Sequence, residues 1–157
     1  MNIPKSIVRI FVMLPNGQIG AQLRDNIPGI ASQGMLSTFG GGVDIGEIPR
    51  QAAVREMEEE TCLTSDDYTM EFIATFTHQK TQNDRKILQS NHLFLAIVSD
   101  GDKIAIKEGV GLVVLRKDVD FEKVNAGEGT QMAWKLLQEY LKSQSTHELF
   151  AARGLKL

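Results

Sequence analysis

Apolar and polar positions alternate along several segments of the chain, and this period of two predicts β-strands. The first two predicted strands meet at Pro15-Asn16-Gly17, a sequence typical of a tight turn. A polar segment at residues 80–90 separates two later strands and is predicted to be a loop that borders a substrate site. The predicted strands are residues 7–14, 18–24, 71–79, 92–99, 103–106 and 111–115.

Two segments instead repeat their apolar residues every three to four positions, as a helix with one buried face does. The first helix is predicted to begin at Pro49, whose fixed φ suits a first helical position, and to extend to Glu60. A capping-box pattern that begins at Ser145 predicts a further short helix near the C-terminus. Together these elements predict an α+β fold with a mixed sheet between helices. The apolar stripe of the second helix consists of Met132, Ala133, Leu136, Leu137, Tyr140 and Leu141.

Composition narrows the class of protein. The length of 157 residues suits one domain, residues 1–157, with a buried core. A net charge of −3 argues against a nucleic-acid polymer as partner, because duplex binding needs a dense basic surface. The single cysteine, Cys62, excludes an intramolecular disulfide, and the longest apolar stretch, residues 93–98, is too short to span a membrane. We therefore expect a cytoplasmic protein without membrane association, as a monomer or a homodimer.

The first predicted helix carries a group of carboxylates on one face. Glu56, Glu59 and Glu60 are spaced i, i+3 and i+4, which places them within an arc of roughly 100°. Carboxylates gathered in this way repel one another unless a cation lies between them. Hard divalent metals such as Mg²⁺ prefer oxygen ligands and can hold phosphate on their open positions. The spacing indicates phosphate chemistry, while a solvated acidic helix is the alternative interpretation.

Residues 41–63 extend this group into a longer pattern of fixed positions. Gly41 is followed after five residues by Glu47 and, after seven more, by Arg55-Glu56-Met57-Glu58-Glu59-Glu60-Thr61-Cys62-Leu63. This string resembles the signature of the Nudix (MutT-type) hydrolases, in which Gly stands at the position of Cys62. Residues 22–39 more loosely resemble the strand and loop before that signature, although family members commonly have Pro where this chain has Phe39.

The resemblance implies a fold, a reaction and a set of metal ligands. The fold would be an α/β/α sandwich with a mixed sheet between helices, and the reaction would be hydrolysis of a diphosphate linkage with Mg²⁺ or Mn²⁺ as cofactor. Glu59 and Glu60 would bind the metal, and Glu56 would be a ligand or the base that activates water. The carbonyl of Gly40 would be a further ligand.

Other residues of the signature would have supporting roles. Arg55 would pair with Glu47 and hold the helix against the preceding loop, and Gly41 is expected to border the substrate. Cys62 replaces the glycine that ends the helix, so we expect a left-handed residue there at a cost on the order of 1 kcal/mol. A functional thiol is the alternative, but no partner for nucleophilic catalysis is recognisable nearby.

Three candidate residues lie outside the signature. Glu108 precedes a predicted strand, where MutT-type enzymes often place an additional acidic ligand or base; the alternative is a solvated turn residue. Arg24, at the end of the second predicted strand, would contact substrate phosphate or remain on the surface. His78 would face the substrate or have a structural role.

Three functions are compatible with these features. The first is a MutT-type nucleoside triphosphate pyrophosphohydrolase that acts on a small phosphorylated nucleotide. The second is a hydrolase of nucleotide sugars, dinucleoside polyphosphates or other diphosphate conjugates. The third is a nucleotide-binding regulator that has lost catalysis. A turnover assay would separate the regulator from both enzymes.

Overall fold

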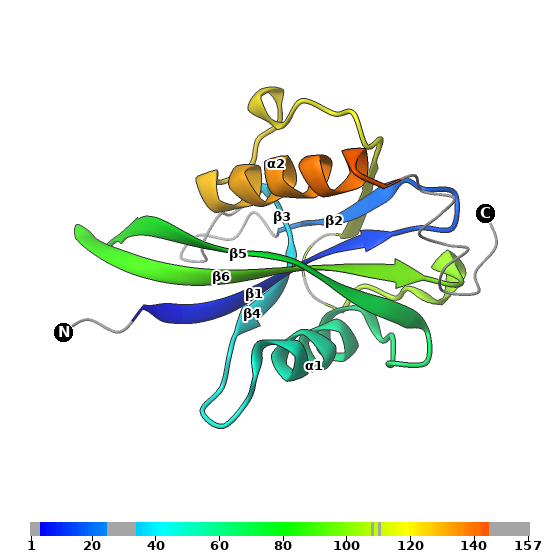
Figure 1. Ribbon diagram of the computed structural model, residues 1–157, viewed down its shortest axis with the longest axis horizontal. Helices are drawn as coiled ribbons and strands as arrows, with labels where there is room; N and C mark the ends of the chain where they lie inside the picture. The colour runs from blue at the N-terminus through cyan, green and yellow to red at the C-terminus, as the bar shows by residue number, and fades with distance from the viewer. Residues whose placement is uncertain (1–3, 25–33, 108, 110, 145–157) are drawn as a thin grey trace.

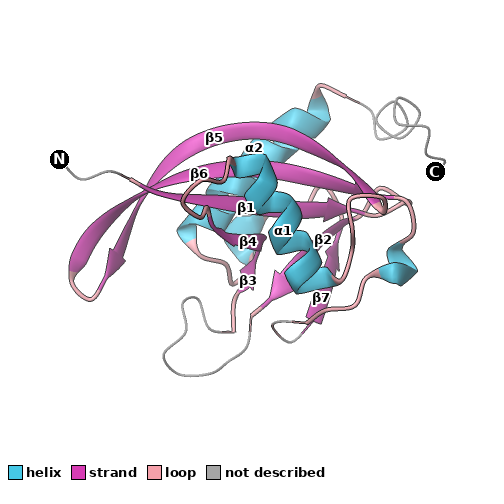
Figure 2. Cartoon of the chain, turned by 90° about the horizontal axis from the view of Figure 1, so that it is seen from below, coloured by secondary structure: helices cyan, strands magenta, loops and turns pink. Residues whose placement is uncertain are grey.

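The computed structural model describes residues 4–24, 34–107, 109 and 111–144. A mixed sheet forms the middle layer, and the two α-helices cover its opposite faces (Figure 1), which confirms the expected α+β sandwich. Seen from below, α1 crosses in front of the sheet and α2 lies behind it (Figure 2). The elements are β1 (Lys5–Met13), β2 (Ile19–Leu23), β3 (Leu36–Ser37), β4 (Phe39–Gly42), α1 (Pro49–Thr61), β5 (Tyr68–Gln82), β6 (Arg85–Val98), η1 (Gly101–Lys103), β7 (Gly111–Leu115), η2 (Phe121–Lys123) and α2 (Glu128–Lys142).

Strand β1 is the centre of the sheet and has two different neighbours along one of its edges. The main strand order is β3-β2-β1-β6-β5, with β4 paired to β1 and β7 paired to β2. On one edge, β1 runs parallel to β6 along its whole length. On the other edge, the segment 7–10 pairs with β4, whereas Val12 and Met13 pair with β2. The sheet therefore forks between β2 and β4.

Alternate residues of β1 pack into two separate cores. Val8, Ile10 and Val12 point to the α1 side, where Met57 is fully buried. Phe11 and Met13 point to the α2 side. On that side, Trp134 of α2 meets Phe11 edge-on and stacks on Phe121, and its indole N–H donates to the carbonyl of Val119 at 2.8 Å. Both helices are thereby fixed to the same central strand.

The boundaries of α1 confirm the prediction from the sequence. Pro49 is the first helical residue, and the N–H of Ile48 just before it donates to the side chain of Gln51 at 3.0 Å. The helix ends at Cys62, which has φ 64° and ψ 4° and is therefore left-handed. The exposed side chain of Cys62 stands in a conformation that glycine adopts at lower cost.

Two predictions of local structure are wrong. Residues 80–90 are not a loop, because β5 and β6 continue as a hairpin to a turn at Asn83 and Asp84, which have φ of 50° and 58°. Hydrogen bonds between the two backbones hold this part of the hairpin together, although its side chains show no alternation of apolar and polar residues. Residues 103–106 do not form a strand, since η1 takes up Lys103 and the N–H of Ala105 donates to Thr61 at the end of α1. The short helix expected from Ser145 lies outside the described residues.

The predicted strand at 111–115 and the apolar stripe of the C-terminal helix are confirmed as β7 and α2. Within the described part of the chain, no helix is both long enough and apolar enough to cross a membrane.

Candidate active site

Two glycines of β4 allow its backbone to lie close to β1 and to the carboxylates of α1. Gly40 has φ 134°, and a Cβ at this position would collide with the carbonyl of Val8 on β1. A Cβ at Gly41 would collide with the carboxylate of Glu56. Neighbouring Gly42 has open space around the position of a Cβ. Gly41 is thus the glycine that the carboxylate face of α1 requires.

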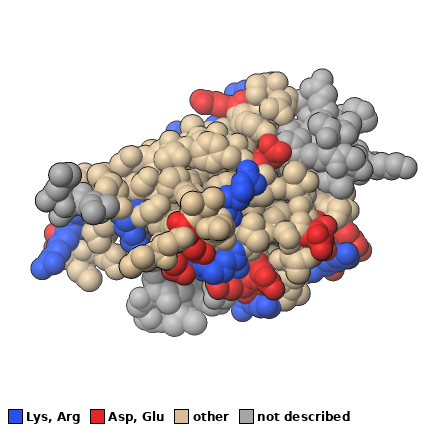
Figure 3. Space-filling view, turned by 60° about the horizontal axis from the view of Figure 1, so that its bottom comes forward, with Lys and Arg blue, Asp and Glu red and all other residues tan. Residues whose placement is uncertain are grey.

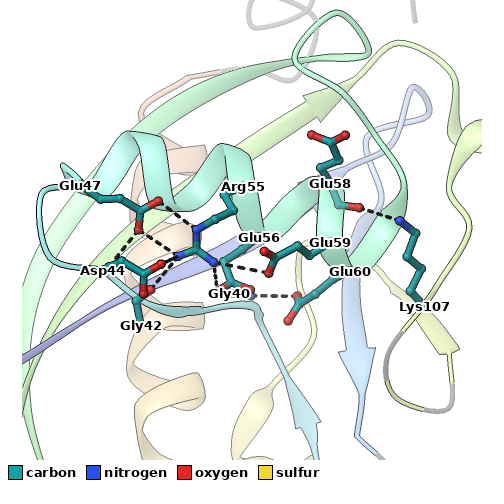
Figure 4. A network of polar contacts seen from close by, with 10 residues as sticks. All are labelled: Gly40, Gly42, Asp44, Glu47, Arg55, Glu56, Glu58, Glu59, Glu60 and Lys107. Atoms are coloured by element: carbon teal, nitrogen blue, oxygen red, sulfur yellow. Dashed lines mark hydrogen bonds and ion pairs between the residues drawn. The ribbon is translucent and has the colours of Figure 1, made fainter.

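Arg55 lies at the centre of a network that links the loop before α1 to the carboxylates on the helix (Figure 4). Its Nε and Nη2 donate to the two carboxylate oxygens of Glu47, both at 2.9 Å, and Nη2 also donates to the carbonyl of Gly42 at 3.0 Å. Its Nη1 donates to Glu56 at 2.9 Å and to Glu59 at 3.4 Å. One guanidinium therefore fixes the loop and two carboxylates of the helix together.

The charges of this network stabilise one another. The hydrogen bond from Arg55, with a second from the backbone N–H of Asp44, lowers the pKa of Glu47 to about 2. The same carboxylate raises the pKa of the Arg55 guanidinium above its ordinary value. On the α1 side of the molecule, acidic and basic side chains lie directly beside one another (Figure 3). Glu47 and Arg55 are consequently both ionised at neutral pH, as the expected pairing requires.

The three carboxylates of the helix face differ in their access to solvent. The side chain of Glu59 is 53% exposed and that of Glu56 is 12% exposed. Glu60 is only 4% exposed, and its Oε2 accepts the backbone N–H of Gly40 at 3.0 Å. A buried carboxylate beside a partly exposed one provides both a fixed ligand and an open approach from solvent.

The chemistry of this donor set fits a hard divalent cation, because all of its groups are oxygen ligands. Their present orientations are only partly suitable. Among the residues that the structure describes, no three acidic, histidine or cysteine side chains already converge into a metal site. One oxygen each of Glu56 and Glu59 points to Arg55, so both carboxylates would have to rotate to share a cation.

A pocket of about 520 Å³ lies on the α2 side of the fork in the sheet. Arg24 and His78 both border it, whereas Gly41 lies with the carboxylates. Figure 1 shows β3 and β4 passing from the α2 side of the sheet to the α1 side, and they connect the two regions: Ser37 of β3 borders the pocket, and Gly40 of β4 contacts Glu60. The pocket is bordered by Ile7, Arg9, Arg24, Met35, Ser37, His78, Gln79, Lys80, Thr81, Gln89, Gly127, Glu128, Gly129 and Thr130.

Glu108 lies outside the described residues, so its predicted role is not examined by the structure. The segment immediately before it reaches the carboxylate helix. The backbone N–H of Lys107 donates to the carbonyl of Glu60 at 2.9 Å, and its Nζ donates to the carbonyl of Glu58 at 3.3 Å.

Two cationic residues of the pocket were missed by the analysis of the sequence. Arg9 lies in the first strand, where its charge interrupts an otherwise apolar run, and that interruption was the available signal. Its Nε donates to Asn91 at 2.7 Å and its Nη1 donates to Thr130 at 3.3 Å. Lys80 was not singled out, although the segment 80–90 was expected to border a substrate site, and β5 carries Lys80 along the border of the pocket.

Comparison with known proteins gives the family of this chain. The model of the NUDIX domain matches residues 4–143, so the chain belongs to the Nudix family. It is an enzyme, a Nudix hydrolase. The search of curated proteins gave no match.

Solved structures share the fold at low sequence identity. The Ap4A hydrolase of C. elegans, solved as a binary complex, is 19% identical, with a TM-score of 0.69 over 89% of this chain and 99% of that chain. A mutT/nudix family protein from Listeria innocua is 19% identical, with a TM-score of 0.69 over 90% and 97% of the two chains. The E. coli dihydroneopterin triphosphate pyrophosphohydrolase is 14% identical, with a TM-score of 0.69 over 88% and 99%.

Proposed function

We propose that this Nudix hydrolase cleaves a diphosphate linkage in a nucleoside diphosphate joined to another group, with Mg²⁺ or Mn²⁺ as cofactor. The simplest substrate of this kind is a nucleoside triphosphate, as in MutT-type enzymes. The observation that carries the proposal is the carboxylate face of α1. Glu56 and Glu59 there accept hydrogen bonds from the guanidinium of Arg55, and Glu60 accepts the backbone N–H of Gly40. This arrangement is suited to phosphate chemistry.

The residues that would hold the cation are Glu59, Glu60 and the carbonyl of Gly40, with Glu56 either as a further ligand or as the base. A divalent cation bound there supplies positive charge to the diphosphate and acidifies a coordinated water. Glu60 is already held beside Gly40, because its Oε2 accepts the backbone N–H of that residue at 3.0 Å. Glu59 is exposed enough to reach a substrate that arrives from solvent.

We assign Glu56 as the general base, whose carboxylate accepts the proton of the attacking water. Its side chain is mostly shielded from solvent, and Arg55 donates to its Oε1 at 2.9 Å, which fixes the orientation of the whole carboxylate. Arg55 acts as a positioning residue through Glu47 and Gly42. Glu108 is the alternative base.

The part of the substrate beyond the diphosphate would occupy the pocket on the α2 side. Arg24 and His78 border this pocket, which agrees with their predicted role in substrate binding. Pockets at the place where strands diverge are common ligand sites, because the backbone there leaves space that no neighbouring strand fills.

A second candidate function is supported by the charge of the same pocket. Among the residues that the structure describes, its border contains three basic side chains and one exposed acidic side chain, Glu128. Such a border favours a diphosphate conjugate with a charged far end over a nucleoside triphosphate whose neutral base would enter the pocket. Among the natural classes, dinucleoside polyphosphates and phosphorylated nucleotide conjugates have this property.

The proposal is tested by removing one charge at a time from α1. We expect Glu59→Gln and Glu60→Gln each to reduce turnover at limiting Mg²⁺ by at least about a hundredfold, while the fold is retained. Glu58→Gln is the matched control, since Glu58 is on the same helix but exposed and away from the network of Arg55.

The assay is phosphate release from a panel of nucleoside triphosphates and diphosphate conjugates with and without Mg²⁺. Near-normal rates for both variants would contradict the metal assignment. Absence of turnover on every diphosphate, together with tight nucleotide binding, would instead support the regulator.

A further inference from the structure

The pocket on the α2 side gathers basic side chains that the diphosphate chemistry does not use. Arg9, Arg24 and Lys80 come from three different strands or strand ends and border the same space. Burial, and then the neighbouring charges of Arg9, Lys5 and Arg24, lower the pKa of Lys80. Cations placed this close together repel one another, which favours a bound anion.

Arg9 is the best-defined member of this group. Its two hydrogen-bond acceptors, Asn91 and Thr130, are neutral, and the part of the chain that the structure describes gives it no carboxylate partner. Burial lowers its pKa to about 10, so it is still charged at neutral pH. A guanidinium that is partly removed from water without an opposite charge is costly, and a bound anion offsets that cost.

Two polar groups of the pocket wall also lack hydrogen-bond partners among the described residues. Nε of Arg24 is buried without an acceptor. His78 is only 9% exposed, and neither of its ring nitrogens makes a hydrogen bond, although Nε2 lies 3.5 Å from a carboxylate oxygen of Glu128. Buried polar atoms in native proteins are rarely left in this state, so both point to a ligand in the pocket.

The first turn of α2 completes the wall. Gly127 occupies the capping position of α2, and no described side chain caps this end of the helix, whose residues 127–130 border the pocket. A Cβ at Gly129 would collide with the guanidinium of Arg9 and would lie 3.4 Å from Nδ1 of His78. Glycine at this position therefore lets both side chains reach the same space beside the helix N-terminus, where anions bind favourably.

We infer that this pocket binds a second phosphate group of the substrate, separate from the diphosphate that is hydrolysed, and that Arg9, Arg24 and Lys80 recognise it. The inference rests on the proposed function and specifies its substrate class. Preferred substrates are diphosphate compounds whose far part carries a phosphomonoester or a further phosphate of a chain. The planar guanidinium of Arg9 presents paired N–H donors that match the oxygens of a phosphate. Glu128 does not prevent the binding of a phosphate, because its side chain is 77% exposed and extends into solvent.

The first experiment measures binding without catalysis. Two pairs of compounds differ by one phosphate only: coenzyme A with dephospho-coenzyme A, and NADPH with NADH. Affinities are measured by calorimetry on the full chain with chelator present, so that no metal draws the diphosphate to α1. We expect the compound with the additional phosphate to bind at least about tenfold more tightly, which is the scale of one charge-assisted pair in a shielded site.

Variants assign this preference to the pocket. Arg9→Met keeps an unbranched apolar stem but removes the guanidinium, and it should reduce the ratio of the two affinities to about one. Arg24→Gln and Lys80→Gln, at partly exposed positions, provide the same test if the Arg9 variant fails to fold. Lys123→Gln removes an exposed positive charge of η2, away from the pocket, and should leave the ratio unchanged.

The second experiment measures kcat/KM for the same pairs with Mg²⁺. Preference for the additional phosphate in the wild type, and its loss in the pocket variants but not in Lys123→Gln, is the expected result. Equal binding within both pairs, no binding of either, or an unchanged ratio in the folded pocket variants would overturn the inference. Turnover of both compounds without preference leaves the proposed hydrolase function intact, whereas loss of turnover on every diphosphate contradicts that function alone.

Discussion

Gly41→Ala should damage catalysis while leaving the fold nearly intact. An ideal Cβ at Gly41 lies 2.8 Å from Cδ and 3.2 Å from Oε2 of Glu56, and closer still to Oε1. Carbon atoms in contact prefer about 3.5 to 4.0 Å, so the carboxylate of Glu56 must move by roughly 1 Å. Gly41 does not have a left-handed φ, so alanine adds no backbone strain.

The expected changes in stability and in rate both follow from the displacement of the Glu56 carboxylate. The group displaced is the end of a flexible side chain, and Arg55 retains its two hydrogen bonds to Glu47, so we expect a change of less than about 1 kcal/mol in the free energy of unfolding. The group displaced is also the proposed base. A misplacement of about 1 Å costs on the order of a hundredfold in rate, or about 2.7 kcal/mol of activation free energy.

The assay compares Gly41→Ala with Gly42→Ala by kcat/KM on a diphosphate substrate and by chemical denaturation. Gly42 is the matched control, because a Cβ there meets no atom within 4 Å and its backbone also lacks a left-handed φ. Equal activity of the two variants would refute the role of Gly41 as the space for Glu56. Unfolding of Gly41→Ala would refute the argument that only the carboxylate moves.

Two further predictions concern the ends of the network. Cys62→Gly should be neutral or stabilise the protein by up to about 1 kcal/mol, with activity retained, because the left-handed strain at Cys62 disappears while glycine adds unfolded-state entropy. Cys62→Ala keeps the Cβ and should match the wild type in stability. Loss of activity without unfolding in both variants would indicate a functional thiol. The lowered pKa of Glu47 predicts a contribution to stability that is fully present above its ordinary value of 4.5 and is lost as the pH falls toward about 2. Melting temperatures measured across this range should fall less steeply for Glu47→Gln than for the wild type, and parallel curves would contradict the pairing with Arg55.

The sequence predicted α1 well because the signals for that helix are local. Pro49 and the spacing of the three carboxylates act within a few residues, and the left-handed residue at Cys62 was expected from the glycine that the Nudix signature has at this position. The different burial of Glu59 and Glu60 could not be predicted in the same way. It depends on β4, whose Gly40 lies against Glu60 only after the sheet has formed.

The errors have a common physical origin in backbone pairing that the pattern of side chains does not show. Residues 80–90 are polar, yet they pair as strands because each backbone group finds its partner across the hairpin. Residues 103–106 are apolar in part, yet the N–H of Ala105 and that of Lys107, just after them, bond to the end of α1 rather than to a strand. Arg24, His78 and the segment 80–90 were expected near the substrate, but Arg9 could not be grouped with them, since it becomes their neighbour only in the folded sheet.

The fork in the sheet also has a consequence for the length of the substrate. Arg9 faces the pocket from β1, and its register partner Gly40 holds Glu60 on the other side of the sheet. A strand that is hydrogen-bonded to β6 along its whole length has a fixed rise of about 3.3 Å per residue and does not extend. The proposed phosphate pocket and the proposed metal site therefore stay at a constant separation, and a compound with too short or too long a linker between its phosphates would occupy one of them without placing its diphosphate at the other.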